Sequence, residues 1–193
     1  MRIFLGARYK TARPTAFLDR DGTINRNRHG EYITRPDQFE LYDCTIPALK
    51  MIEEKGYQLV VLSNHSGIGR GYMSLETAIE INTKMTEQLK KAGVNIAGIY
   101  VCPHLPDAGC DCRKPKTGLL DEAISEIPAD LKHSFVAGDS AGDIRLAAAA
   151  NIPSYLVLTG AGRRTAAKFP EVRKYGTLLS LARSLPDVSK ISN

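Results

Sequence analysis

The sequence predicts an α/β fold, a doubly wound parallel sheet with helices on both faces. Two observations predict it. Short apolar runs of strand length alternate along the chain with runs that have helical periodicity. The chain also has 193 residues, of which 43% are hydrophobic and 24% charged, and this suits one folded domain and excludes general disorder. We therefore expect a single domain over residues 1–193 with its core at about 15–160.

The first half of the chain supplies two expected strands and two expected helices. Thr15–Asp19 is a short apolar strand that ends at an Asp-Gly turn. Thr45–Lys55 has apolar residues on one helical face, and Gly56 ends it. Tyr57–Ser63 is a continuous apolar run, typical of a buried strand. A long helix follows, capped by Ser74 and running to about Ala92, before a second stop glycine.

The second half continues the alternation. Ile96–Val101 is the third expected strand and leads into a cysteine-rich loop. Thr117–Ile127 is expected to be helical and to end before a proline. His133–Ala137 is the fourth strand, Asp143–Ala150 a helix and Ser154–Leu158 the fifth strand. Parallel strands with helical crossovers account for this order.

Charge and hydropathy limit the partners. There are 26 Lys and Arg against 21 Asp and Glu, a net charge of +5, but the basic residues are scattered from Arg2 to Lys190. We expect a few of them to face an anionic small molecule and expect no nucleic-acid partner. The longest apolar run, Leu59–Leu62, is far too short to span a membrane, and Arg and Lys interrupt the N-terminal region of a would-be signal peptide. We expect a cytoplasmic monomer.

Three of the four cysteines are clustered with a histidine. Cys102 and His104 are separated by one residue, as are Cys110 and Cys112, and a Pro- and Gly-containing turn connects the pairs. Three thiolates and an imidazole suit tetrahedral Zn²⁺. Because the protein supplies all four ligands, we expect a structural zinc site without an open position for a catalytic water. The remaining residue, Cys44, is expected to be a buried thiol.

Polar residues follow four of the expected strands. They are Asp19 and Asp21, Ser63 and Asn64, Arg113 and Lys114, and Asp139 and Asp143. In a parallel sheet these segments meet at one edge, where ligands bind. Carboxylates grouped there need a cation, and hard oxygen ligands favour Mg²⁺. A carboxylate that attacks phosphorus, a second one for acid–base work and a nearby lysine together indicate phosphoryl transfer to Asp19 followed by hydrolysis.

These motifs resemble those of the haloacid dehalogenase superfamily of phosphatases. The resembling segments are Asp19-Arg-Asp21-Gly-Thr, Ser63-Asn64, Arg113-Lys114-Pro and Gly138-Asp139-x-x-x-Asp143. The runs FLDRDGTIN, SNHSGIGRGY and CPH-x5-CDCRKPKTG are similar to the branch that hydrolyses D-glycero-D-manno-heptose 1,7-bisphosphate or histidinol phosphate. The resemblance covers about Thr15 to Leu158. It implies a Rossmann-like core with a minimal cap or none.

The resemblance also implies residue roles. Asp19 would be the nucleophile and Asp21 the general acid and base, with Ser63 and Lys114 stabilising the transferring phosphoryl group. Mg²⁺ would be bound by the Asp19 carboxylate, the Asp21 backbone carbonyl and Asp139. Asp143 is open between binding the metal, capping its helix and orienting Lys114.

Substrate contacts are expected from three segments. They are Asn27, Arg28, His29 and Tyr32 after the first motif, Asn64, His65 and Ser66 in the second, and Arg113 in the third. Position 65 is His where the branch usually has Gln, and Ser140 stands where Lys is common.

The implied activity is that of a Mg²⁺-dependent phosphatase acting on a phosphorylated sugar, with the 7-phosphate of the heptose bisphosphate as the leading substrate. Three alternatives remain open at this point. One is a histidinol-phosphate phosphatase, and another is a phosphatase of DNA 3′ ends. The last is a zinc-stabilised binding module without catalysis.

Overall fold

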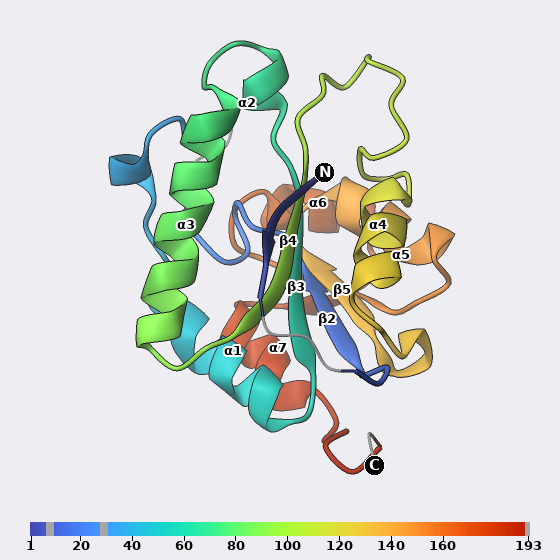
Figure 1. Ribbon diagram of the computed structural model, residues 1–193. Coiled ribbons are helices and arrows are strands. Elements are labelled where there is room, and N and C mark those ends of the chain that lie inside the picture. Colours follow the sequence, from blue (N-terminus) through green and yellow to red (C-terminus); the bar gives the residue numbers. More distant parts are fainter. Residues whose placement is uncertain (7–9, 28–30, 192–193) are drawn as a thin grey trace.

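The computed structural model in Figure 1 describes residues 1–6, 10–27 and 31–191. Its central feature is a seven-stranded sheet in the order β1-β4-β3-β2-β5-β6-β7. The strands are β1 (Arg2–Leu5), β2 (Thr15–Leu18), β3 (Gln58–Asn64), β4 (Ile96–Cys102), β5 (Phe135–Gly138), β6 (Ser154–Val157) and β7 (Arg173–Tyr175). All neighbours pair in parallel except β1, which is antiparallel to β4. The predicted fold class is confirmed.

The helices connect the strands. They are α1 (Thr45–Glu54), α2 (Ser66–Gly69), α3 (Leu75–Lys91), α4 (Gly118–Glu126), α5 (Ala141–Ala149), α6 (Gly162–Lys168) and α7 (Leu178–Ser184), with 3₁₀ turns η1 (Pro36–Gln38) and η2 (Leu131–His133). The four predicted helices are all present. Ser74 caps α3 as expected, because its side chain accepts a hydrogen bond from the backbone N–H of Thr77.

The sheet has a hydrophobic layer on each face. Helices α1, α3 and α7 bury Ile52, Met85 and Leu181 against one face, and Leu18 points into that layer. Helices α4 and α5 cover the other face, where Phe17 lies in the second layer (Figure 1). Adjacent residues of β2 thus serve opposite layers, as strand geometry requires.

Apart from the two 3₁₀ turns, five strands and helices were not predicted. The edge strands β1 and β7 are half or fully exposed; β1 has an apolar run of only three residues, at positions 3–5, and β7 has none. Helices α2 and α6 are short, with four and seven residues. Helix α7 does have a readable signal, because Thr177 and Ser180 form a capping box before an apolar face. The sheet and its covering helices therefore extend beyond the range of 15–160.

The connections at one end of the sheet surround its carboxyl edge. Helix α2 follows β3, and the loop after β4 projects beside it (Figure 1). In the described part of the β2–α1 connection, the only helical or strand element is the three-residue η1, so no large cap is present there. Among the described residues, no helix is long and apolar enough to cross a membrane.

Candidate active site

The carboxyl ends of β2, β3 and β5 bring the predicted motifs together. Leu18, the last residue of β2, pairs with Val61 on one side and with Ala137 on the other. The residues that follow, Asp19 and Asp139, therefore lie at one edge of the sheet. Both residues are buried, at 8% and 5% exposure.

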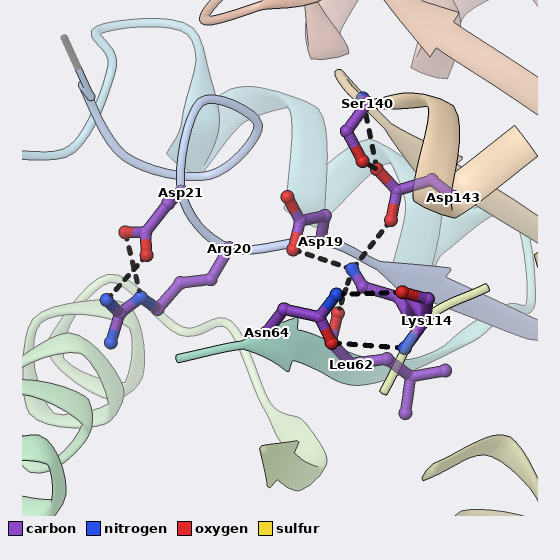
Figure 2. A network of polar contacts seen from close by, with 8 residues as sticks. All are labelled: Asp19, Arg20, Asp21, Leu62, Asn64, Lys114, Ser140 and Asp143. Carbon is purple, nitrogen blue, oxygen red and sulfur yellow. Dashed lines mark hydrogen bonds and ion pairs between the residues drawn. The ribbon is translucent and has the colours of Figure 1, made fainter. Parts of the chain in front are cut away.

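Lys114 is at the centre of a buried ionic network (Figure 2). Its ammonium donates hydrogen bonds to Asp19 Oδ1 at 2.8 Å, to Asp143 Oδ1 at 2.6 Å and to the Leu62 carbonyl at 2.6 Å. These three bonds use all the protons of the ammonium group. Burial would lower the pKa of Lys114, but the charges of Asp143 and Asp19 outweigh it and raise that pKa. Lys114 is therefore a fixed cation beside the Asp19 carboxylate.

Asn64 holds the backbone of Lys114. Its side-chain amide donates to the Lys114 carbonyl, and its Oδ1 accepts from the Lys114 N–H, both at 3.1 Å. Ser63 lies next to it, 1% exposed at the end of β3. The second and third motifs are thus joined directly.

Three carboxylates form a group that suits a hard cation. Asp19, Asp139 and Asp143 each offer an oxygen, and these oxygens all lie within 4.8 Å of one another. Burial raises the pKa of Asp19 to about 6 and that of Asp139 to about 8, and the other carboxylates add to both rises. Without a further positive charge the carboxylates disfavour one another's ionised form, so the donor set fits Mg²⁺. The backbone N–H of Ala161 donates to Asp139 Oδ2 at 2.6 Å and fixes that carboxylate.

Asp143 makes both of the non-metal contacts considered from the sequence. One carboxylate oxygen accepts from Lys114, and the other accepts from the Ser140 backbone N–H and hydroxyl at 3.1 and 2.6 Å. The second contact is a capping box at the start of α5. Asp143 therefore connects the helix cap to the lysine.

Asp21 lies apart from this group (Figure 2). Its carboxylate faces Arg20, whose Nε and Nη2 donate to Oδ1 and Oδ2 at 3.1 and 2.8 Å. Asn25 donates a further bond to Oδ1 at 3.0 Å. Burial alone would raise the pKa of Asp21, but the Arg20 charge and these bonds lower it. Each aspartate of the first motif is thus paired with a cation, but the pKa of Asp19 is raised and that of Asp21 is lowered.

The residues predicted to contact substrate differ in their burial and in their hydrogen-bond partners. The Tyr32 hydroxyl is 3.4 Å from Ser66 Oγ, and Arg70 Nε donates to it at 3.1 Å. Arg113 Nη1 donates to the His104 carbonyl at 3.3 Å. His65 is 2% exposed, and within the described chain neither of its ring nitrogens has a hydrogen-bond partner. Burial lowers its pKa to about 3, so the ring is neutral.

A polar cavity of about 470 Å³ adjoins Tyr32. Its lining residues are Arg26, Asn27, Glu31, Tyr32, Ile33, Gln38, Glu40 and Tyr42. It includes Asn27, which the sequence places on the substrate loop. Arg28 and His29, the other two residues expected there, lie outside the described residues.

The cysteine loop brings its four expected ligands together. Cys102 and Cys110 sulfurs are 3.7 Å apart, as are those of Cys110 and Cys112, and His104 Nδ1 is 3.2 Å from the Cys112 sulfur. A tetrahedral zinc ion with bonds of about 2.3 Å to sulfur has sulfur–sulfur edges of about 3.8 Å. All four cysteines of the chain are free thiols, and Cys44 is half-buried rather than buried. The donor set and its spacing fit Zn²⁺.

Comparison with known proteins identifies the family. The family described as "Polynucleotide kinase 3 phosphatase" matches residues 14–169. The chain belongs to this family. It is thus a phosphatase of the haloacid dehalogenase superfamily, as the four motifs predict.

Similar proteins cover three quarters or more of the phosphatase chain. A D-glycero-beta-D-manno-heptose-1,7-bisphosphate 7-phosphatase of Photorhabdus laumondii is 38% identical over 92% of this chain and 97% of its own. A protein of the same description from Pasteurella multocida is 42% identical over 75% of this chain and 81% of its own. A crystal structure of D,D-heptose 1,7-bisphosphate phosphatase from B. bronchiseptica, complexed with magnesium and phosphate, has 32% identity and a TM-score of 0.83. It aligns with 89% of this chain and 97% of its own.

Sequence reasoning missed several residues of this phosphatase site. Arg20 and Asn25 hold Asp21, and the backbone of Ala161 holds Asp139. Arg20 lies between the two aspartates of the first motif, and from the sequence alone an arginine is expected to be exposed. No pattern marks Ala161, because its contact uses only the backbone.

Proposed function

We propose that this phosphatase is Mg²⁺-dependent and hydrolyses a sugar bisphosphate through an aspartyl-phosphate on Asp19. The substrate that we propose is D-glycero-D-manno-heptose 1,7-bisphosphate, which loses its 7-phosphate. The buried Asp19–Lys114 pair at the carboxyl end of β2 is the observation that carries the chemistry. The substrate rests on the relatives that match 75–92% of the chain under that description.

The proposed first step transfers the phosphoryl group. The Asp19 carboxylate attacks phosphorus, the bond between phosphorus and the sugar oxygen breaks, and Asp21 in its protonated form gives its proton to that oxygen. Ser63 and Lys114 stabilise the phosphoryl oxygens as charge spreads over them. Esterification removes the negative charge of Asp19, so Asp19 becomes a weaker acceptor for the Lys114 ammonium. Lys114 then lies next to the phosphoryl group that Asp19 carries.

The second step restores the enzyme. Asp21, now a carboxylate, takes a proton from water, and the water oxygen attacks the phosphorus of the aspartyl-phosphate. The bond between phosphorus and Asp19 breaks, which releases inorganic phosphate and the free carboxylate. The sum is one water consumed for each phosphate released.

Two metal ions complete the proposal. Asp19, Asp139 and the backbone carbonyl of Asp21 would hold Mg²⁺, which supplies positive charge to the phosphoryl group when bound. Cys102, His104, Cys110 and Cys112 would hold a structural Zn²⁺ at the base of the loop that carries Arg113 and Lys114. We propose that residues 1–193 act as one domain and as a monomer.

Phosphate release from a panel of substrates tests the proposal. The panel contains both anomers of the heptose bisphosphate, fructose 1,6-bisphosphate, histidinol phosphate and a 3′-phosphorylated oligonucleotide. We expect the heptose bisphosphate to have the highest kcat/KM, by at least about tenfold. A preference for histidinol phosphate would show instead that the protein is a histidinol-phosphate phosphatase. Salt-sensitive turnover of the oligonucleotide would favour a phosphatase of DNA 3′ ends.

The nucleophile is tested by Asp19→Asn. We expect turnover of every substrate to fall at least about a thousandfold, because the attacking carboxylate is gone. Asp187→Asn is the matched control, since Asp187 accepts hydrogen bonds from the backbone N–H and hydroxyl of Ser189 and lies in the C-terminal segment, after the last of the four motifs. Normal turnover by Asp19→Asn would contradict the mechanism and favour a binding module.

A further inference from the structure

Arg20 is a buried arginine at the centre of the first motif. Its side chain is 1% exposed and is the largest fully buried side chain among the described residues. Burying a guanidinium is costly unless a carboxylate is paired with it. In the described part of the chain, Asp21 is the ion-pair partner of Arg20, and Arg20 Nη1 has no hydrogen-bond partner.

The pair has a two-bond geometry that fixes orientation. Nε and Nη2 of Arg20 each donate to a different oxygen of Asp21, a bidentate pair that restricts rotation of the carboxylate. Arg20 is enclosed by protein and lies two residues after the end of β2. A rotation of Asp21 away from it would leave a buried charge unpaired, which is strongly unfavourable.

The two carboxylate oxygens of Asp21 differ in their contacts. Oδ1 accepts two bonds, from Arg20 Nε and from Asn25 Nδ2. Oδ2 accepts one bond, from Arg20 Nη2. The Asp21 side chain is 22% exposed, against 1% for Arg20. Oδ2 is therefore the oxygen with acceptor capacity left, on a side chain that ligands can reach.

We propose that Arg20 is a positioning residue, which holds the Asp21 carboxylate so that Oδ2 exchanges the proton with the leaving oxygen of the substrate. This rests on the proposed function, in which Asp21 is the general acid and base. Arg20 itself touches no reacting atom. It fixes the direction of the Asp21 carboxylate, and Asn25 adds a further hydrogen bond to Oδ1.

Leaving groups distinguish positioning from a general structural role. A sugar alkoxide is a poor leaving group and needs the proton of Asp21, whereas 2,4-dinitrophenolate leaves without one. For Arg20→Met we expect kcat on the sugar phosphate to fall about 100-fold, with KM within about threefold of the wild type. Because Asp21 also serves the second step, 2,4-dinitrophenyl phosphate is followed in its first turnover only. The rate of that dinitrophenolate burst reports the transfer to Asp19 and should stay within about threefold of the wild type. Asp21→Asn should show the same selectivity for the sugar ester.

Further variants sharpen the test. The double variant Arg20→Met with Asp21→Asn should be no slower on the sugar phosphate than Asp21→Asn alone, because both changes remove one function. Arg20→Lys keeps the buried charge but loses the planar two-bond grip, and it should lie between the wild type and Arg20→Met. If Arg20→Met does not fold, Arg20→Lys alone tests the inference.

The matched control is Arg35→Met. Arg35 also pairs through Nε and Nη2 with an aspartate, Asp37, at 3.1 and 3.2 Å, but both residues are exposed and lie outside the site. We expect no change with either ester.

Three results would overturn the inference. Equal losses of sugar-phosphate turnover and of the first-turnover dinitrophenolate burst would make Arg20 merely structural, and a multiplicative double variant would separate it from Asp21. Unchanged turnover in both Arg20 variants would remove the role altogether. A wild-type protein that hydrolyses neither ester would instead overturn the proposed function, and the positioning role with it.

Discussion

Beyond the end of β2, the buried ammonium of Lys114 forms ion pairs with the buried carboxylates of Asp19 and Asp143. Lys114 is enclosed with Asp19 and Asp143, at side-chain exposures of 3%, 11% and 3%. Desolvation works against each of these charges alone, and their mutual attraction offsets it. The same contacts that orient the proposed nucleophile therefore also contribute to the stability of the folded state.

Replacement of Lys114 tests this double role. Lys114→Met leaves two buried carboxylates without their counter-charge, so we expect the free energy of unfolding to fall by about 3–5 kcal/mol. Urea denaturation followed by circular dichroism measures it. Lys116→Met removes an exposed lysine that pairs with Asp111, and its unfolding midpoint should stay near that of the wild type. Similar midpoints for the two variants would show that the buried network adds no stability.

Gly160 allows a close approach to Asp139. Its φ is +51°, and a Cβ there would lie 2.1 Å from Asp139 Oδ2 and 2.6 Å from the Cα of Gly22. We expect Gly160→Ala to displace the Asp139 carboxylate and to weaken Mg²⁺ binding about 10- to 100-fold. Calorimetric titration with Mg²⁺ measures the affinity. Gly176→Ala is the control, because no atom lies within 4 Å of its added Cβ, and an equal affinity in both variants would refute the argument.

Among the strands, the sequence predicts those that have an apolar run in the chain. The five central strands begin and end within one or two residues of their predicted bounds, because each is buried and has an apolar run. Strand β7 has no such run and β1 has only the three apolar residues 3–5, and both strands lie at the edges of the sheet. Motif spacing placed Asp19, Lys114 and Asp139 at one edge, but the burial of Arg20 depends on packing that no local pattern encodes.

The cysteine loop connects a metal site to the end of the sheet. Cys112 directly precedes Arg113 and Lys114, so the position of one end of the loop also fixes theirs. We expect Cys112→Ser to lose Zn²⁺, to lower the Tm and to reduce kcat about 10- to 100-fold as Lys114 shifts. Metal content by mass spectrometry and a thermal melt measure the first two effects. Cys44→Ser, which changes the thiol outside the loop at the cap of α1, should retain the metal, and zinc retained by Cys112→Ser would contradict the four-ligand site.

The whole molecule depends on elements that lie after the predicted core. Helix α7 packs beside α1, and Leu178, Leu181, Leu185 and Val188 are all buried in the larger hydrophobic layer. Lys55, which follows α1, donates to three carbonyls around the end of α7, those of Ala182, Arg183 and Leu185. A cation there satisfies acceptors that the helix leaves unpaired. The C-terminal segment is thus a structural part of the fold.

Truncation tests this dependence. Burial of one leucine contributes about 1.5–3 kcal/mol, so loss of the three leucines and the valine approaches the about 5–15 kcal/mol of a typical domain. A chain that ends at residue 160 should therefore lack a cooperative thermal transition by circular dichroism, while one that ends at residue 190 should melt like the full protein. Because the active-site loops depend on the same sheet, the shorter chain should also lose phosphatase activity. A cooperative melt at residue 160 would show that α7 is dispensable and that the five central strands fold without it.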